Sequence, residues 1–409
     1  MLTTYSNWIS CQIGAREHYA ISRALHQQGQ LAHLITDAWV LPRSSLNLLP
    51  KNLLTKLRER YHPDLAQASV YTFTSSLISF ELTQRIQRKT GWELIIARNY
   101  WFQKESVRFL ERISHKFRDR PTLFAYSYAA LELFRYAKTK GWYTVLGQID
   151  PGILEEKLVL EEHTKYPNYA SKSIQAPLSY WNNWQEECSL ADRIVVNSQW
   201  SSRLLQEAGI SGHKIEIIPL IYTPSDAAKH WVRTYPQSFS QERPLRVLFL
   251  GQVILRKGMA ALLEAVEYLK GYPIEFWIVG LPQIKISPAL QTHPQIRWFG
   301  QISRSQTVNY YQNADVFLFP TLSDGFGLTQ LEAQAWRLPI IASRYCGDVA
   351  IDGCNGLVLS EVNGEAIAES LIFCLQHPED LRGFSQHSST VRSFDLSQLA
   401  NQLQSISVT

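Results

Sequence analysis

Residues 316–343, VFLFPTLSDGFGLTQLEAQAWRLPIIAS, decide the fold of this chain. An apolar run ends at Pro320, a polar loop follows, and helical periodicity begins near Leu328. The pattern predicts a strand, a loop and a helix, which is the repeating unit of a parallel α/β sheet. Ligands of such sheets bind beyond the carboxyl ends of the strands, and unpaired N–H groups at a helix start, here at Leu328, suit hydroxyls or phosphate oxygens.

Two acidic residues flank a glycine-rich turn in this stretch. Asp324 precedes Gly325-Phe326-Gly327, and Glu332 follows about one turn into the helix. The glycines can adopt backbone angles closed to other residues and let a ligand approach the main chain. Two carboxylates converging on one crevice would accept charge-assisted hydrogen bonds from sugar or ribose hydroxyls.

Two other interpretations of these acids stay open. Asp324 could cap the helix while Glu332 is a solvated helix residue. The pair could also belong to a hydrolase. On one helix the two carboxylates would lie ~12 Å apart, beyond the roughly 5 to 9.5 Å used in glycoside hydrolysis, but the intervening loop shortens that distance.

A second motif precedes the first by about seventy residues, in LRVLFLGQVILRKGMAALLEAV, residues 245–266. An apolar strand runs into Gly251, and Arg256 and Lys257 stand where the next helix opens. Basic side chains at that position could neutralise a pyrophosphate that gains charge as it leaves. The alternative is a solvated basic surface. No phosphate-binding G-x-x-x-x-G-K-[ST] and no dinucleotide-binding G-x-G-x-x-G pattern occurs.

Strand and helix patterns alternate through most of the chain, and this predicts an α/β protein with two doubly wound layers. We expect an N-terminal domain at 1–218, a linker at 219–244 where prolines gather, and a second α/β domain at 245–390. A C-terminal helix at 391–409 is expected to pack back on the first domain.

Composition excludes several classes of protein. The 409 residues are 45% hydrophobic and 19% charged, which is typical of a globular protein. No apolar run approaches the ~18 residues of a membrane span, and the first residues do not resemble a secretory signal, so we expect a cytoplasmic protein. Five scattered cysteines without a C-x-x-C predict buried thiols.

Charge is unevenly distributed. Residues 1–150 hold 20 Lys and Arg against 11 Asp and Glu, whereas residues 151–409 hold 20 against 25. From Leu46 to Arg60, leucines lie at helical spacing opposite lysines and arginines, as in a helix that binds a membrane surface. This segment predicts peripheral contact with the cytoplasmic membrane face; the alternative is an ordinary surface helix.

The two motifs together resemble the family 4 (group 1) retaining glycosyltransferases of the GT-B fold. Members of this family typically show a strand ending in Gly-Arg, a Lys-Gly five residues later, then an acid, Gly-Phe-Gly and a Glu. Lys257-Gly258 matches here, and seven residues separate Asp324 from Glu332 as in the family. The resemblance is specific from about 245 to 376 and weaker before that.

The resemblance implies two Rossmann-like domains facing each other across a cleft. Residues 1–218 would form the acceptor-side domain, and residues 245–390 the nucleotide-sugar-binding domain. It implies that a sugar moves from a nucleotide-sugar to a glycan, lipid-linked or small-molecule acceptor, with retention and without a metal. Glu332 would bind the ribose, and Asp324 with the main chain of residues 325–328 would bind the donor sugar. Lys257 and Arg256 would bind the diphosphate, beside Gly251 and Gln252.

This chain departs from the family at three places. Asp324 stands where Glu is usual, and Gln252 stands where Arg is usual, so Arg256 would have to supply that charge. Where the family often has a His after a strand, this chain has Gly147-Gln148-Ile149-Asp150-Pro151-Gly152. Asp150 could orient the acceptor or cap the following helix.

The loop CQIGAREH at 11–18 should face the donor phosphates and the acceptor in this fold. Gly14 remains of the family's usual glycine pair, and Arg16 and His18 could contact anions or serve as helix-start surface residues. Because no Asp-x-Asp occurs and the histidines lack ligand spacing, we expect no metal. We also expect no other cofactor and no nucleic-acid partner.

The departures motivate a second hypothesis, a catalytically weakened GT-B protein that binds nucleotide or glycan. A third is a nucleotide-sugar hydrolase or epimerase of the same fold.

Overall fold

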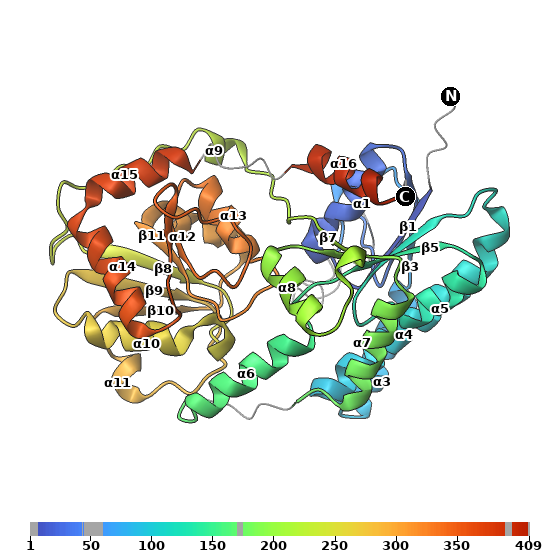
Figure 1. The fold of residues 1–409 in the computed structure, drawn as a ribbon, viewed down its shortest axis with the longest axis horizontal. Coiled ribbons are helices and arrows are strands. Elements are labelled where there is room, and N and C mark those ends of the chain that lie inside the picture. Colours follow the sequence, from blue (N-terminus) through green and yellow to red (C-terminus); the bar gives the residue numbers. More distant parts are fainter. Residues whose placement is uncertain (1–6, 43, 45–59, 170–174, 389–394, 408–409) are drawn as a thin grey trace.

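The computed structural model describes residues 7–42, 44, 60–169, 175–388 and 395–407. The predicted membrane-binding segment, except for Arg60, lies outside these residues. The described chain forms two parallel sheets with helices on both faces (Figure 1). The expected fold class, α/β with two doubly wound domains, is therefore confirmed. Among the described residues, no helix combines the length and apolarity needed to span a bilayer.

The N-terminal sheet has seven parallel strands in the order β3-β2-β1-β4-β5-β6-β7. Side chains along its strands alternate between the two faces, as strand geometry requires. In β4, Leu123 and Ala125 pack toward one helix layer, whereas Phe124 and Tyr126 pack toward the other. The strands are β1 (Trp8–Gln12), β2 (Leu31–Thr36), β3 (Val70–Thr72), β4 (Thr122–Tyr126), β5 (Tyr143–Gly147), β6 (Arg193–Val196) and β7 (Ile215–Ile217).

Helices cover both faces of this sheet. One face packs against α4, α5 and α7, and the other against α1. The side chain of Glu187, from α7, accepts the N–H groups of Ala130 (2.9 Å) and Leu131 (3.1 Å) and so satisfies the start of α5. The N-terminal helices are α1 (Ala20–Gln27), α3 (Thr74–Ile86), α4 (Gly91–Ile113), α5 (Leu131–Thr139), α6 (Ile153–Lys165), α7 (Leu178–Leu190) and α8 (Gln199–Glu207).

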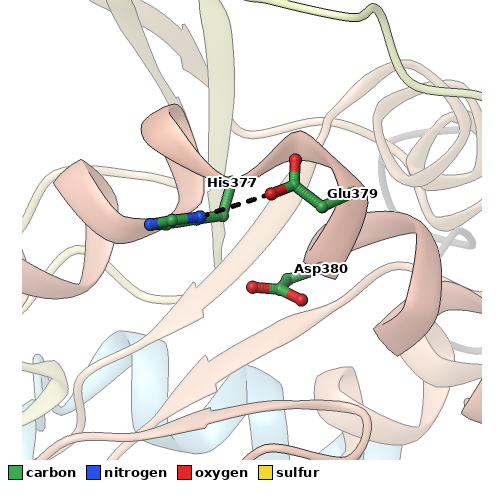
Figure 2. A group of neighbouring side chains, drawn as sticks. All are labelled: His377, Glu379 and Asp380. Carbon is green, nitrogen blue, oxygen red and sulfur yellow. Dashed lines mark hydrogen bonds and ion pairs between the residues drawn. The ribbon is translucent and has the colours of Figure 1, made fainter.

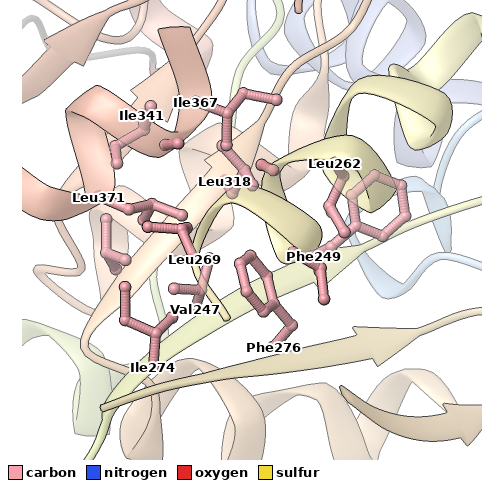
Figure 3. Close-up of a cluster of buried hydrophobic side chains, with 14 of the residues drawn as sticks. Val247, Phe249, Leu262, Leu269, Ile274, Phe276, Leu318, Ile341, Ile367 and Leu371 are labelled. Atoms are coloured by element: carbon pink, nitrogen blue, oxygen red, sulfur yellow. The ribbon is translucent and has the colours of Figure 1, made fainter. Parts of the chain in front are cut away.

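The C-terminal sheet has six parallel strands in the order β10-β9-β8-β11-β12-β13. Its strands are β8 (Leu245–Leu250), β9 (Ile274–Val279), β10 (Ile296–Gly300), β11 (Val316–Phe319), β12 (Ile340–Ala342) and β13 (Gly356–Val358). Its helices are α10 (Met259–Tyr268), α11 (Pro288–Gln291), α12 (Thr307–Asn313), α13 (Leu328–Ala335), α14 (Gly364–Gln376) and α15 (Pro378–His387). Figure 3 shows the core between this sheet and α10 and α14, where Phe249, Phe276 and Leu318 meet Leu262 and Leu371.

The segment between the sheets is not a free connector. Tyr235 and Phe239 are part of the C-terminal core, and the short helix α9 (Asp226–Lys229) places Ala228 in the second apolar cluster of that domain. At the other end of the chain, α16 (Leu396–Ser407) packs against α1 of the N-terminal domain, burying Leu399 and Leu403. Figure 1 shows this return in red.

Helix α6 runs between the two domains (Figure 1). At its start, Glu155 is paired with Arg256 of the C-terminal domain (3.3 Å). Just past its end, the Tyr166 hydroxyl donates to Glu264 (2.8 Å) on α10. These contacts tie an N-terminal helix to the surface of the other domain.

The periodicity of residues 15–28 predicts a helix over that range, but the regular helix α1 begins later. Glu17, His18 and Tyr19 all have positive φ (50°, 52° and 59°), and regular helix starts only at Ala20. Three consecutive non-glycine residues in the left-handed region store backbone strain, which usually persists at functional sites. Sequence periodicity could not show this, because strain of this kind depends on surrounding contacts.

Candidate functional site

The loop between β11 and α13 is closed by hydrogen bonds of its own chain. The Asp324 N–H donates to the carbonyl of Tyr345 (3.0 Å), and the Asp324 carboxylate accepts the N–H of Phe326 (3.3 Å). The Phe326 ring is buried, 3% exposed. The acidic side chain is therefore held at the carboxyl end of the strand, next to the start of α13 at Leu328.

Lys257 reaches the same point from the neighbouring strand. Its ammonium forms an ion pair with Asp324 and lies 5.0 Å from the centre of the Phe319 ring. Burial, and then the Arg256 guanidinium, lower the pKa of Lys257 from its ordinary value. The nearby carboxylate of Glu155 opposes that shift.

Gly258 makes this approach possible. It has a φ of 74°, and a Cβ atom at this position would lie 1.7 Å from the carbonyl oxygen of Pro320. The turn that carries Lys257 can therefore lie directly against the end of β11. The backbone of Arg256 extends the contact, because its carbonyl accepts the N–H of Leu322 (2.9 Å).

The Arg256 side chain is held between domains. Its guanidinium donates to the Ser323 carbonyl (2.6 Å) and pairs with Glu155 on α6. Burial raises the pKa of Glu155, although the charge of Arg256 opposes that shift. Gln252, after Gly251 at the end of β8, is exposed, and its carbonyl accepts the N–H of Ile254 (3.1 Å).

Glu332 contacts a different set of residues. It accepts the Tyr311 hydroxyl (2.8 Å) and lies 3.6 Å from the guanidinium of Arg304. Burial raises the pKa of Glu332, while Tyr311 and Arg304 oppose the shift. Arg304 also contacts the His18 ring of the N-terminal domain, with 2.9 Å between Nη1 and Nδ1. Burial, followed by the charge of Arg304, lowers the pKa of His18 to about 4, so this ring is neutral at pH 7.

Asp150 follows β5 in the N-terminal domain and lies next to the loop between β11 and α13. Its Oδ1 atom accepts three hydrogen bonds, from the Tyr128 hydroxyl (2.5 Å), the Gln148 amide (3.1 Å) and the Gly152 N–H (2.9 Å). The bond from Gly152 resembles a helix cap at the start of α6. The expectation that Asp150 caps this helix therefore describes one of its three contacts. Oδ2 makes none of these three bonds.

Gly325 brings Asp150 next to the acidic loop. A Cβ atom on Gly325 would lie 2.3 Å from the carbonyl oxygen of Ile149 and 3.5 Å from the Cα of Asp150. Nearby, Trp200 of α8 donates to the Ser323 hydroxyl (2.9 Å). The ends of β5 and β11 therefore meet where the two domains touch.

The loop after β1 completes this edge. Gly14 has a φ of 78°, and its N–H donates to the carboxylate of Asp37 (3.0 Å). Asp37 is itself paired with Arg60. The Arg16 guanidinium lies over the ring of Tyr126, 5.4 Å from its centre.

A match to known proteins covers the C-terminal part of the chain. Residues 234–390 match the family described as glycosyl transferases group 1. The C-terminal domain therefore resembles the group 1 glycosyl transferases. The matched residues include both sequence motifs, 245–266 and 316–343.

Curated relatives are similar to this chain over part of their length. The capsular polysaccharide biosynthesis glycosyltransferase CapM of Staphylococcus aureus is 28% identical over 154 residues, which is 35% of this chain and 40% of CapM. A D-inositol 3-phosphate glycosyltransferase of Xylanimonas cellulosilytica is 30% identical over 267 residues, 56% of this chain and 60% of that protein. The chain spans about half the length of such relatives.

Solved structures match almost the whole chain in fold. HepE of Anabaena in complex with UDP-glucose aligns with a TM-score of 0.62 and 13% identity, covering 99% of this chain and 100% of HepE. Sucrose-phosphate synthase of Thermosynechococcus elongatus aligns with a TM-score of 0.63 and 16% identity, covering 98% of each chain. At this identity the likeness establishes the two-domain fold.

The structure adds candidate site residues that the motifs do not contain. Arg304 follows the end of β10, and Tyr128 follows the end of β4; both therefore lie in loops after strands, where the sheet rule directs attention. Glu155 lies within the first turn of α6, soon after Asp150. The sequence rule that ligands bind after strands could have pointed to each of these loops. Only the folded chain shows which of their side chains meet.

A separate cluster offers metal-type ligands. Within the described part of the chain, His377, Glu379 and Asp380 bring their ligand atoms within 4.8 Å of one another (Figure 2). His377 Nδ1 lies 3.3 Å from a carboxylate oxygen of Glu379. Both acids lie in the first turn of α15, where a helix start stabilises negative charge, and this accounts for their position without a metal.

Proposed function

We propose that this protein moves a sugar from a nucleotide-sugar donor to an acceptor, with retention of anomeric configuration and without a metal ion. The observation that carries the proposal is the meeting of Lys257, Asp324 and Gly325 with Asp150 at the ends of strands from both sheets. The cationic, acidic and main-chain groups that would bind the donor then lie across the domain boundary from the carboxylate that would bind the acceptor.

The donor would bind along the C-terminal strand ends. Glu332 would accept hydrogen bonds from the ribose hydroxyls, and Asp324 with the N–H groups after it would bind the sugar. Lys257 and Arg256 would neutralise the diphosphate, Arg256 in place of the arginine that Gln252 replaces. HepE, whose fold is similar to that of this chain, was solved in complex with UDP and with UDP-glucose. UDP-glucose is therefore the first donor to test.

The reaction would follow a front-face path. The bond between the anomeric carbon and the diphosphate oxygen breaks, the acceptor oxygen bonds to the same face of that carbon, and the acceptor proton passes to the leaving phosphate. This path requires positioning and charge stabilisation more than a protein nucleophile. The basic pair supplies charge stabilisation where the leaving group gains charge.

Asp150 would orient the acceptor. Because its three described hydrogen bonds all use Oδ1, the Oδ2 atom is available to accept a bond from an acceptor hydroxyl.

A donor panel tests the proposal. The protein is incubated with UDP-, GDP- and ADP-sugars, with and without glycan acceptors, and products are identified by mass spectrometry, with NMR of the new linkage to read the anomeric configuration. EDTA should leave the rate unchanged. We expect one donor to be consumed and Glu332→Ala to lose that turnover. Inverted product, or loss of activity in EDTA that a divalent cation restores, would contradict the mechanism.

Two related expectations remain proposals. Similarity to CapM supports a role in polysaccharide assembly. We also propose that the protein acts in the cytoplasm. Peripheral membrane contact through residues 46–60 is tested by replacing Lys51, Lys56, Arg58 and Arg60 with Gln. We expect these changes to abolish sedimentation with anionic vesicles, and unchanged sedimentation would remove the membrane hypothesis.

A further inference from the structure

A cavity lies in the N-terminal domain, between α4, α5 and α7. Its volume is about 140 Å³. An engineered cavity of about 150 Å³ holds a benzene molecule, so this one has the size of a six-membered ring. Residues that line it include Asn99, Tyr100, Tyr128, Tyr180, Asn183 and Trp184.

Aromatic rings form much of the wall. Tyr128 and Tyr180 stack with their centres 4.8 Å apart and an interplanar angle of 17°. Trp92 also contacts Tyr180, at 4.8 Å between ring centres. Trp184 is completely buried. These rings give the cavity a largely aromatic wall.

Most polar groups in the wall are neutral, and the Glu132 carboxylate, also in the lining, is paired with Arg135 (2.6 Å). Among the described contacts, the Asn99 and Asn183 amides and the Tyr180 hydroxyl make no side-chain hydrogen bond. Glu187, by contrast, accepts three backbone N–H groups, from Tyr128, Ala130 and Leu131. The lining contains no Lys, Arg or His, so an anionic ligand would find no counter-charge there.

The cavity adjoins Asp150. Tyr128, in its wall, donates directly to the Asp150 carboxylate (2.5 Å). Trp184 donates to Gln148 (2.9 Å), whose amide in turn donates to Asp150. A ring in the cavity would therefore lie one side chain away from the carboxylate that we assign to the reacting acceptor hydroxyl.

We propose that this cavity binds a neutral pyranose ring of the acceptor, the sugar unit adjacent to the one that is glycosylated. A pyranose has an apolar C–H face for the tyrosine rings and hydroxyls for the amides and Tyr180. The inference rests on the proposed transferase function and narrows it, because an acceptor that fills both positions is an oligosaccharide or a glycoside.

Ligand-observed saturation-transfer NMR on the full chain tests the site. The probes are the methyl glycosides of glucose, galactose and N-acetylglucosamine, with phenol and inorganic phosphate as comparison ligands. Asn183→Trp places a large side chain at an exposed lining position, and Asn182→Trp makes the same change at the exposed neighbour that does not line the cavity.

We expect at least one glycoside to bind the wild type and Asn182→Trp, and its affinity to fall about tenfold or more in Asn183→Trp. Phosphate should not compete. Binding of phenol alone, absence of all glycoside binding, or equal binding to both variants would overturn the proposal. UDP binding is measured in parallel: if UDP fails to bind but glycosides bind as expected, the transferase function fails while the sugar site stands.

Discussion

Replacing Lys257 by Met tests the central contact of the site. The substitution keeps an apolar stem on Phe319 but removes the ammonium that pairs with Asp324. A charge-assisted bond to a phosphate contributes about 1.5–3 kcal/mol, so we expect turnover of the donor to fall roughly ten- to hundredfold. Turnover is measured as release of free nucleotide with saturating donor.

Stability separates this role from simple charge balance. Lys257 and Asp324 are 14% and 17% exposed, so Lys257→Met leaves a mostly buried carboxylate without its partner and should lower the melting temperature. Adding Asp324→Asn removes that carboxylate and should restore part of the stability. Turnover should stay low in the double variant, because nothing replaces the cation at the diphosphate.

A matched control is Lys229→Met. Lys229 also pairs with an aspartate, Asp226, at 2.8 Å, but both side chains are exposed, and such pairs contribute at most about 1 kcal/mol. We expect near-normal activity and stability. If Lys257→Met kept a near-normal rate, or if the double variant regained turnover along with stability, Lys257 would serve only to neutralise Asp324.

Three further results are expected. Gly258→Ala should destabilise the protein by about 1 kcal/mol or more, since the new Cβ meets the Pro320 carbonyl at a positive φ; calorimetry measures this, and an unchanged melting temperature would refute the packing argument. Because burial raises the pKa of Glu332, this side chain should take up a proton at a higher pH than an ordinary Glu, and the donor KM should rise as the pH falls. In Glu332→Gln the donor KM should be independent of pH near neutral and mildly acidic pH. Parallel KM profiles for wild type and variant would contradict the ribose assignment. Asp150→Asn keeps an oxygen for the three donors at Oδ1, so the melting temperature should hold while transfer to acceptor falls about tenfold or more; normal transfer would show that Asp150 acts only as a cap.

Much of the C-terminal domain was predictable because its signals are local. The apolar runs that end at Gly251 and Pro320 coincide with β8 and β11, since buried parallel strands have near-continuous apolar sequences, and the helices expected after them are α10 and α13. The spacing of Asp324 and Glu332 is likewise a property of consecutive residues. In the first domain, β3 and β7 are only three residues long, and so short a strand has too little periodicity to predict.

The sequence alone determined the two α/β layers and the polar residues at the ends of strands, because backbone periodicity and glycine conformations are encoded by near neighbours. Only the tertiary structure decided which of those residues meet. Lys257 and Asp324 are 67 residues apart, and Arg304 and His18 are 286 apart, so their pairing depends on strand order and on how the domains pack. The same packing set the burial of Glu332 and created the ring-lined cavity beside Asp150, since desolvation and cavities arise only when distant segments exclude water together.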